Sequence, residues 1–155
     1  MSTISSQRGM WFEEFQVGQC VISPGRTITE SDIVSFAGIS GDYTQIHTDA
    51  EFSTKTPFGK RVAHGLLVLS VASGLATRTG LLEGTVIAFR EITNWKFSLP
   101  VYIGDTIHVE LNIIETRPVP RLKGGSVQIE IVVKNQRDEV TMKGTWNVLV
   151  ASKPE

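Results

Sequence analysis

The chain has 155 residues and a formal net charge of -1, and 41% of its residues are hydrophobic and 20% charged. This length suits one domain that can bury a substantial core, and the composition is that of a globular rather than a disordered or fibrous protein. The basic residues are scattered. A nucleic-acid-binding surface needs a basic stripe, so this class of function is disfavoured.

Signals for targeting and compartment are few. The single cysteine, Cys20, cannot form an internal disulfide, so nothing indicates an oxidising compartment. Residues 1–11 lack the apolar core of a signal peptide, and the longest apolar stretch, 65–76, is too short to span a bilayer. We therefore expect a cytoplasmic protein without membrane contact, with a flexible tail over residues 1–10 and a single domain over residues 11–151.

The first third of the chain predicts a strand and two short helices. Residues 19–28 have the composition of a strand. Thr29 to Asp32 have the form of a capping box, in which side chains bond the free N–H groups at a helix start. This helix should end near Gly38. A polar, turn-like stretch over residues 40–48 and a second short helix over about 49–53 should follow.

The remainder predicts a central helix and a set of strands. Residues 65–79 carry apolar or small side chains on nearly every side, which is typical of a helix surrounded by other structure, and Gly80 ends it. Strands are expected over residues 85–98, 106–116, 127–134 and 140–150. Several of them alternate apolar and polar residues, so one face of the sheet needs a cover.

These elements predict an α+β fold in which a curved antiparallel sheet wraps around one long central helix. The helix covers the apolar face of the sheet, and sequential strands pair as hairpins. Such a sheet leaves edge strands exposed, which favours a homodimer or a dimer of dimers.

The strongest candidate for chemistry lies between residues 40 and 47. Asp42 and His47 stand five residues apart in a turn, and Gly41 permits a tight turn beside the carboxylate. Such a pair can share one water molecule, because the carboxylate accepts a proton and the imidazole titrates near neutrality. The spacing alone fits equally well an ordinary Asx-turn followed by a partly buried histidine.

Several motifs occur around this pair in a definite order. The central one is Phe36-x-x-Ile39-Ser40-Gly41-Asp42-x-x-x-Ile46-His47, and the others span residues 12–18, 26–32, 61–65 and 97–105. Together they resemble the MaoC-like family, the (R)-specific enoyl-CoA hydratases with a hot-dog fold. The likeness runs from about Trp11 to Val150, nearly the whole chain.

The resemblance implies a role for four residues. The family's catalytic pair falls on Asp42 and His47, the backbone N–H that polarises the thioester falls on Gly65, and a pocket serine falls on Ser73. The free N–H groups of a helix start carry partial positive charge, which supports the role of Gly65 on physical grounds. The family usually has Asn-Pro where this chain has Thr44-Gln45, a departure that bears on substrate preference rather than on reaction class.

Other polar residues are weaker candidates. His64 precedes the central helix and is interpreted as structural. Lys60 and Arg61 either bind the phosphates of a coenzyme A arm or are simply solvated. The three histidines are far apart in the sequence and no ligand cluster accompanies them, so we expect no metal. Coenzyme A, as part of the substrate, is the only cofactor-like group expected.

The resemblance implies reversible syn addition of water to a trans-2-enoyl thioester, giving an (R)-3-hydroxyacyl thioester, as in fatty acid metabolism. Two alternatives stay open: a hot-dog acyl-CoA thioesterase and a non-catalytic acyl-thioester binding protein. Residues 65–76 contain no acid where such a thioesterase is expected to carry one, and the Asp–His pair argues against binding alone. The sequence does not choose between coenzyme A and an acyl-carrier protein, nor does it set the acyl chain length or the direction of reaction.

Overall fold

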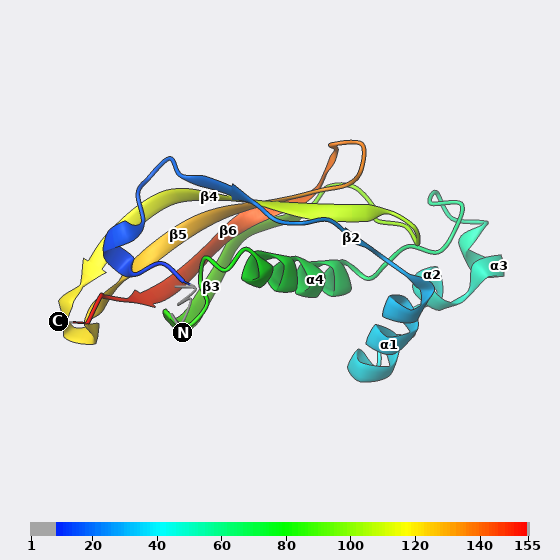
Figure 1. Cartoon of the computed structure of the whole chain (residues 1–155). Coiled ribbons are helices and arrows are strands. Elements are labelled where there is room, and N and C mark those ends of the chain that lie inside the picture. Colours follow the sequence, from blue (N-terminus) through cyan, green and yellow to red (C-terminus); the bar gives the residue numbers. More distant parts are fainter. Residues whose placement is uncertain (1–8, 155) are drawn as a thin grey trace, which may run out of the picture.

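Figure 1 shows the computed structural model, in which residues 9–154 are described. An antiparallel sheet of six strands arches over one long helix, α4 (Gly65–Arg78). The strands are β1 (Cys20–Ile22), β2 (Arg26–Thr27), β3 (Val86–Phe97), β4 (Thr106–Val119), β5 (Gly124–Lys134) and β6 (Val140–Ala151). The shorter helices are η1 (Phe12–Glu14), α1 (Glu30–Ser40), α2 (Gln45–Thr48), α3 (Ala50–Ser53) and η2 (Pro120–Leu122).

The strands follow the order β1-β4-β5-β6-β3 in the sheet, and β2 pairs with β4 as well. The pairs β4–β5 and β5–β6 are sequential hairpins, and β3 returns to pair with β6 at one edge. Alternate side chains of β4 are buried: Ile107, Val109, Leu111 and Ile113. The expected curved antiparallel sheet around a central helix is confirmed.

The central helix has two different sides. Its buried side chains pack against the sheet: Leu67, Val68, Val71, Ala72, Leu75 and Ala76. Its other side is open within one chain and carries mainly small and polar residues: Leu66, Ser70, Ser73, Gly74 and Thr77. The prediction that residues 65–79 form a helix is confirmed to within one residue, but the helix is covered on one side and not all round.

The prediction of one strand over residues 19–28 is wrong. Two short strands stand there, β1 and β2, separated by Ser23, Pro24 and Gly25. Proline has no N–H to donate to a sheet ladder, so the strand is interrupted at this point. Ser23 keeps the segment attached to β4, because its N–H donates to Val109 O and its hydroxyl accepts from Val109 N, each over 2.9 Å.

Two helix boundaries also differ from expectation. Helix α1 passes through Gly38 and ends at Ser40, where Gly41 adopts a left-handed conformation with φ of 76° and donates its N–H to Ala37 O. The stretch 40–48, expected to be turn-like, contains the single-turn helix α2. The capping box at Thr29 is present as expected, since Thr29 and Asp32 each bond the other's backbone N–H.

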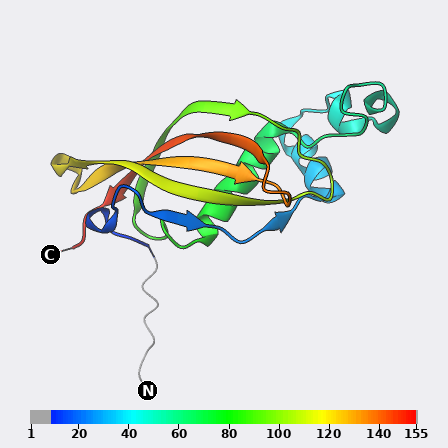
Figure 2. The same ribbon diagram turned by 90° about the horizontal axis from the view of Figure 1, so that it is seen from above.

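Helices α1, α2 and α3 lie beyond one end of the sheet, next to the start of α4 (Figure 2). Near the N-terminus, Met10 N–H donates to Leu81 O over 2.9 Å. The described part of the predicted tail, residues 9 and 10, is therefore attached to the fold. The rest of that prediction, residues 1–8, lies outside the described residues. None of the described helices is long and apolar enough to cross a bilayer.

The packing of the sheet yields a stability prediction. Ile131 on β5 is 0% exposed, so Ile131→Ala should lower the free energy of unfolding by about 2–5 kcal/mol through lost burial and a residual cavity. Ile114 on β4 is 43% exposed, and Ile114→Ala should cost about 0.5 kcal/mol. Chemical denaturation of both variants at one protein concentration measures the two losses. Equal losses would contradict this description of the core.

Candidate active site

The end of α1 sets the position of Asp42. Because Gly41 occupies the left-handed region, the chain leaves the helix in a sharp turn, and residues 42–44 lead directly into α2. Helix α2 carries His47 toward the start of α4, where Val62 N–H donates to Ile46 O over 3.1 Å. A short loop and a single helical turn therefore position both candidate groups, and contacts to the neighbouring segment hold them.

His47 is 8% exposed, and its ring makes one defined hydrogen bond. Its Nδ1 lies 2.7 Å from Val62 O. A carbonyl oxygen only accepts, so Nδ1 carries the hydrogen and Nε2 of the neutral ring keeps a free lone pair. Burial lowers the pKa of His47 most, and His64 adds to the lowering, while the Val62 bond and Asp42 oppose it. At neutral pH the imidazole is a base with Nε2 available.

Asp42 is exposed, and its carboxylate is held by Thr44. Its Oδ1 accepts from the Thr44 N–H over 3.1 Å and from the Thr44 hydroxyl. The hydroxyl, followed by the backbone N–H, lowers the pKa of Asp42 below its usual value, because both donors favour the charged form. Thr44, which the resemblance marked only as a departure from the family, therefore supports the ionised carboxylate.

The structure brings Asp42 and His47 together. One ligand-type atom of each, together with one of His64, lies within a 4.8 Å cluster. His47 also lines a cavity of about 510 Å³ whose walls are mainly apolar, including Phe58, Phe97 and Met142. A neutral imidazole thus lines an apolar cavity and has an ionised carboxylate beside it, although Asp42 itself is exposed and is not among the residues that line the cavity. Such an arrangement can polarise a water molecule next to an apolar ligand.

Gly65, the first residue of α4, lines the same cavity. The N–H groups of a first helical turn have no partner within the helix and carry partial positive charge. A side chain at this position would collide with the Phe97 ring, since a Cβ would lie 2.7 Å from Phe97 Cε1. Glycine is therefore the residue that keeps the helix start close to both the cavity and Phe97.

His64, which the sequence presents as a structural residue, also joins this cluster. Its ring stacks on His47 with centroids 3.9 Å apart, and its Nε2 lies 2.9 Å from the backbone oxygen of Asp42. No spacing in the sequence signals this, because His64 comes from a different segment, 22 residues beyond Asp42. Its place in the folded chain could be found only from the tertiary structure.

The fold brings His47 and His64 together with Asp42, although the two histidines are far apart in the sequence, and each residue offers one potential metal-ligand atom within 4.8 Å of the others. Each ring already uses one nitrogen for a backbone carbonyl, so each has one nitrogen left. A second group of potential ligands contains His108, Glu110 and Asp138. There the Lys134 ammonium bonds Glu110 over 2.8 Å and Asp138 over 3.2 Å, and so supplies the positive charge itself.

Ser73 is not brought to this cluster within one chain. It lies on the open side of α4, eight residues after Gly65, which corresponds to about 12 Å along the helix axis. Its hydroxyl donates to Ser70 O over 2.8 Å. The separation of Ser73 from Gly65 follows from the rise of about 1.5 Å per residue in an α-helix.

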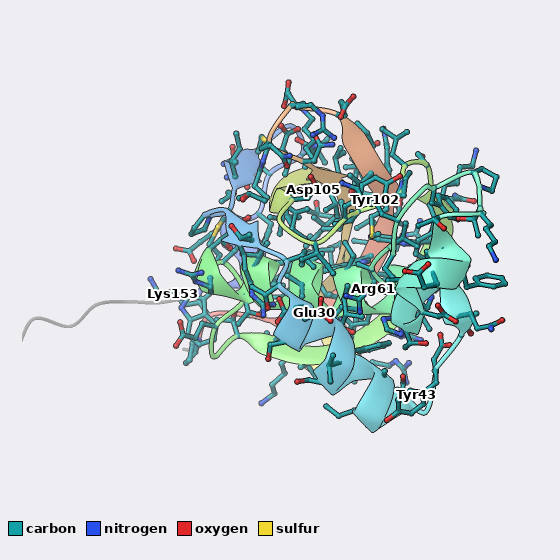
Figure 3. The ribbon with its side chains drawn as sticks, turned by 90° about the vertical axis from the view of Figure 1, so that its right-hand side faces the viewer. Glu30, Tyr43, Arg61, Tyr102, Asp105 and Lys153 are labelled. Carbon is teal, nitrogen blue, oxygen red and sulfur yellow. The ribbon has the colours of Figure 1, made fainter. Side chains whose placement is uncertain are left out.

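The two basic residues before α4 differ in their surroundings. Arg61 forms a two-point ion pair with Glu30, with one N–O distance of 2.8 Å, and Figure 3 shows the two residues next to each other. Lys60 lies over the ring of Tyr102, 4.4 Å from its centroid, on the exposed surface. Of the two, Lys60 keeps its ammonium group accessible for a phosphate.

The contact between Thr44 and Asp42 yields a prediction on ionisation. Thr44→Val removes the hydroxyl that lowers the pKa of Asp42 and leaves the backbone N–H in place. The carboxyl pKa should rise toward its ordinary value, so the carboxylate is protonated at a higher pH on acidification. Carbon-13 NMR titration of the Asp42 carboxyl measures the shift, with Thr44→Ser as the control that retains the hydroxyl. A Val variant with the wild-type titration curve would show that the hydroxyl has no effect.

Comparison with known proteins finds relatives that are named MaoC or dehydratase. The family model described as MaoC like domain matches residues 14–135. Protein MaoC of Klebsiella aerogenes is 44% identical over 101 residues, covering 65% of this chain and 30% of that protein, so the chain spans less than a third of that relative. The 3-hydroxybutyryl-CoA dehydratase of Methylorubrum extorquens is 35% identical over 149 residues, covering 96% of this chain and 88% of that enzyme.

Solved structures agree over nearly the whole chain. The monoamine oxidase regulatory protein of Archaeoglobus fulgidus superposes with a TM-score of 0.88 at 37% identity, covering 97% of this chain and 100% of that one. R-hydratase PhaJ1 of Pseudomonas aeruginosa gives a TM-score of 0.79 at 30% identity, covering 94% and 88%. The expected hot-dog fold is confirmed. By sequence and by structure, this chain belongs to the MaoC-like dehydratase family.

Proposed function

We propose that the protein is a hydro-lyase that reversibly hydrates a trans-2-enoyl-CoA to an (R)-3-hydroxyacyl-CoA. One observation carries the proposal: the ionised Asp42 carboxylate lies within 4.8 Å of a ring nitrogen of His47, and His47 and Gly65 line the same apolar cavity. The dehydratase and the R-hydratase among the relatives support the reaction class and the configuration.

The geometry supports a short reaction sequence. A water molecule bonded to Asp42 and His47 attacks C3 of the enoyl thioester, and its O–H bond breaks as Nε2 of His47 takes the proton. The C3–O bond forms, the double bond opens, and negative charge develops on the thioester oxygen. The proton then passes to C2 from the same side, which completes a syn addition. Acid–base positioning of this kind contributes about 10²–10⁴ in rate.

Gly65 supplies the complementary charge. Its N–H, at the positive end of α4, faces the position where the thioester oxygen becomes enolate-like in the proposed complex. A backbone donor that acts on developing charge contributes on the order of 10²–10³ in rate. The apolar cavity walls accept the acyl chain, and the exposed Lys60 can meet the phosphates of coenzyme A.

Substitution of the pair tests the proposal directly. Asp42→Asn and His47→Gln should each lower kcat by about 10²–10⁴. Asp42→Asn keeps the shape of the side chain and should leave the melting temperature nearly unchanged, whereas His47→Gln loses a buried ring stacked on His64 and should lower it. The measurement is the loss of absorbance of the conjugated double bond over a panel of enoyl-CoAs. Matched controls are Asp138→Asn and His108→Gln, which lie outside the site and should keep full activity.

Three outcomes contradict the assignment. Full activity in either site variant removes the pair from the mechanism. Release of free coenzyme A in a thiol-trapping assay, without hydration, indicates a thioesterase. Tight acyl-CoA binding without turnover at any chain length indicates a binding protein.

We further propose that the protein is a homodimer. Among the described strands β3 pairs only with β6, so its other edge is unpaired. Large apolar side chains are exposed along this strand: Val86, Ile87, Phe89, Ile92 and Phe97. An unpaired edge with exposed apolar side chains favours association with a second copy.

Sedimentation velocity tests the dimer. Its mass should be twice the 17.0 kDa of one chain. Ile87→Lys should shift the protein toward the monomer, because a charge would be buried in the interface, whereas Val17→Lys, in an exposed turn, should not. A monomeric wild-type protein at micromolar concentration would contradict the proposal.

A further inference from the structure

We propose that His64 is a positioning residue that holds Asp42 and His47 in their reactive arrangement; the inference rests on the proposed hydratase function. His64 neither touches the reacting atoms in the proposed mechanism nor lines the cavity. Its action is on the two residues that do the chemistry, and each of them meets a different part of its ring.

The first contact is with the backbone of Asp42. His64 is 2% exposed, and its Nε2 lies 2.9 Å from the Asp42 carbonyl oxygen. A carbonyl only accepts, so Nε2 donates. The other described hydrogen bonds of Asp42 join it to Ser40, the last residue of α1, and to Thr44, each two residues away in the chain. The His64 bond therefore ties the exposed loop to the buried start of α4.

The second contact is with the ring of His47. The two imidazoles stack with centroids 3.9 Å apart and planes at 29°, and Phe36 of α1 lies against His64 with a centroid distance of 5.0 Å. His64 is thus packed between α1 and α2. Rotation of the His47 ring would have to displace a buried neighbour, so the direction of its free Nε2 lone pair is fixed.

A third observation separates this role from simple packing. The Nδ1 of His64 is buried without a hydrogen-bond partner among the described residues. A buried acceptor without a partner destabilises the fold, so a hydrocarbon ring would fill the same space more stably. The imidazole therefore contributes through its Nε2 donor to Asp42. His64 also directly precedes Gly65 in the chain, so its backbone carbonyl carbon is bonded to the Gly65 nitrogen. One residue therefore connects all three proposed catalytic groups.

Three variants separate the two contacts. His64→Phe keeps an aromatic ring and loses the donor, His64→Gln keeps an amide donor and loses the ring, and His64→Ala loses both. We expect kcat to fall by about 10²-fold in the Ala variant, since a misplacement of about 1 Å has this effect. KM should change little, because the cavity walls are intact. The Gln and Phe variants should each recover part of the loss, and His108→Gln should have no effect.

Stability gives an independent readout. His64→Phe replaces the unpartnered Nδ1 by carbon and removes the donor to the Asp42 carbonyl, two effects of opposite sign, so its melting temperature should stay close to that of the wild type. A positioning role predicts a stable protein with a reduced kcat. A purely structural role predicts a wild-type kcat in every variant that melts normally, and this result would overturn the inference.

Nitrogen-15 NMR of the imidazole side chains and backbone amides tests, without an activity assay, whether His64 positions His47 and Asp42. Loss of the stacked ring in His64→Ala should expose His47 and raise its pKa toward the ordinary value, because burial and His64 both lower it. The Asp42 and Thr44 amide signals should shift as well, and none of these signals should move in His108→Gln. If the wild-type protein hydrates no enoyl thioester, the proposed function is wrong, but the NMR signals still show whether His64 holds His47 and Asp42 in place. Unchanged His47 and Asp42 signals in His64→Ala would then refute the positioning role.

Discussion

The packing of one side of α4 against the curved sheet is the interaction on which the rest of the structure depends. Six buried side chains of the helix meet the apolar face of β4, β5 and β6, and this contact fixes both the direction and the depth of the helix. Its start therefore lies at a defined place beside the end of β3, where Phe97 touches Gly65. The cavity, the free N–H groups and the neighbouring loop all take their position from this point.

In the proposed mechanism the chemistry depends on two side chains, Asp42 and His47, and their surroundings lower the pKa of each. Thr44 donates two hydrogen bonds to Asp42 and keeps the carboxylate ionised, while burial keeps His47 neutral. Each effect has a local cause, and the two groups still lie close together. An anionic acceptor and a neutral base in one small volume form the minimum required to orient and deprotonate a water molecule.

The sequence predicted much of the fold because its signals were local. The alternation along β4 and the capping box at Thr29 depend on neighbours within a few residues. The interruption at Pro24 was overlooked, although proline is itself a strand-breaking signal. Helix α2 lacks an apolar period and is held by a tertiary bond to Val62, so no local pattern indicates it. The resemblance supplied the candidate site residues, whereas the contact between His64 and Asp42 joins distant segments and could be found only in the folded chain.

The left-handed turn at Gly41 makes the length of α1 part of the site. Asp42 follows the last helical residue almost directly, so its side chain inherits the angular phase of the helix. One residue inserted before Gly41 would rotate the carboxylate by about 100° and advance it by about 1.5 Å. Replacements on the solvent side of α1 leave that phase untouched. The position of the carboxylate therefore constrains the number of residues in this helix much more tightly than it constrains their composition.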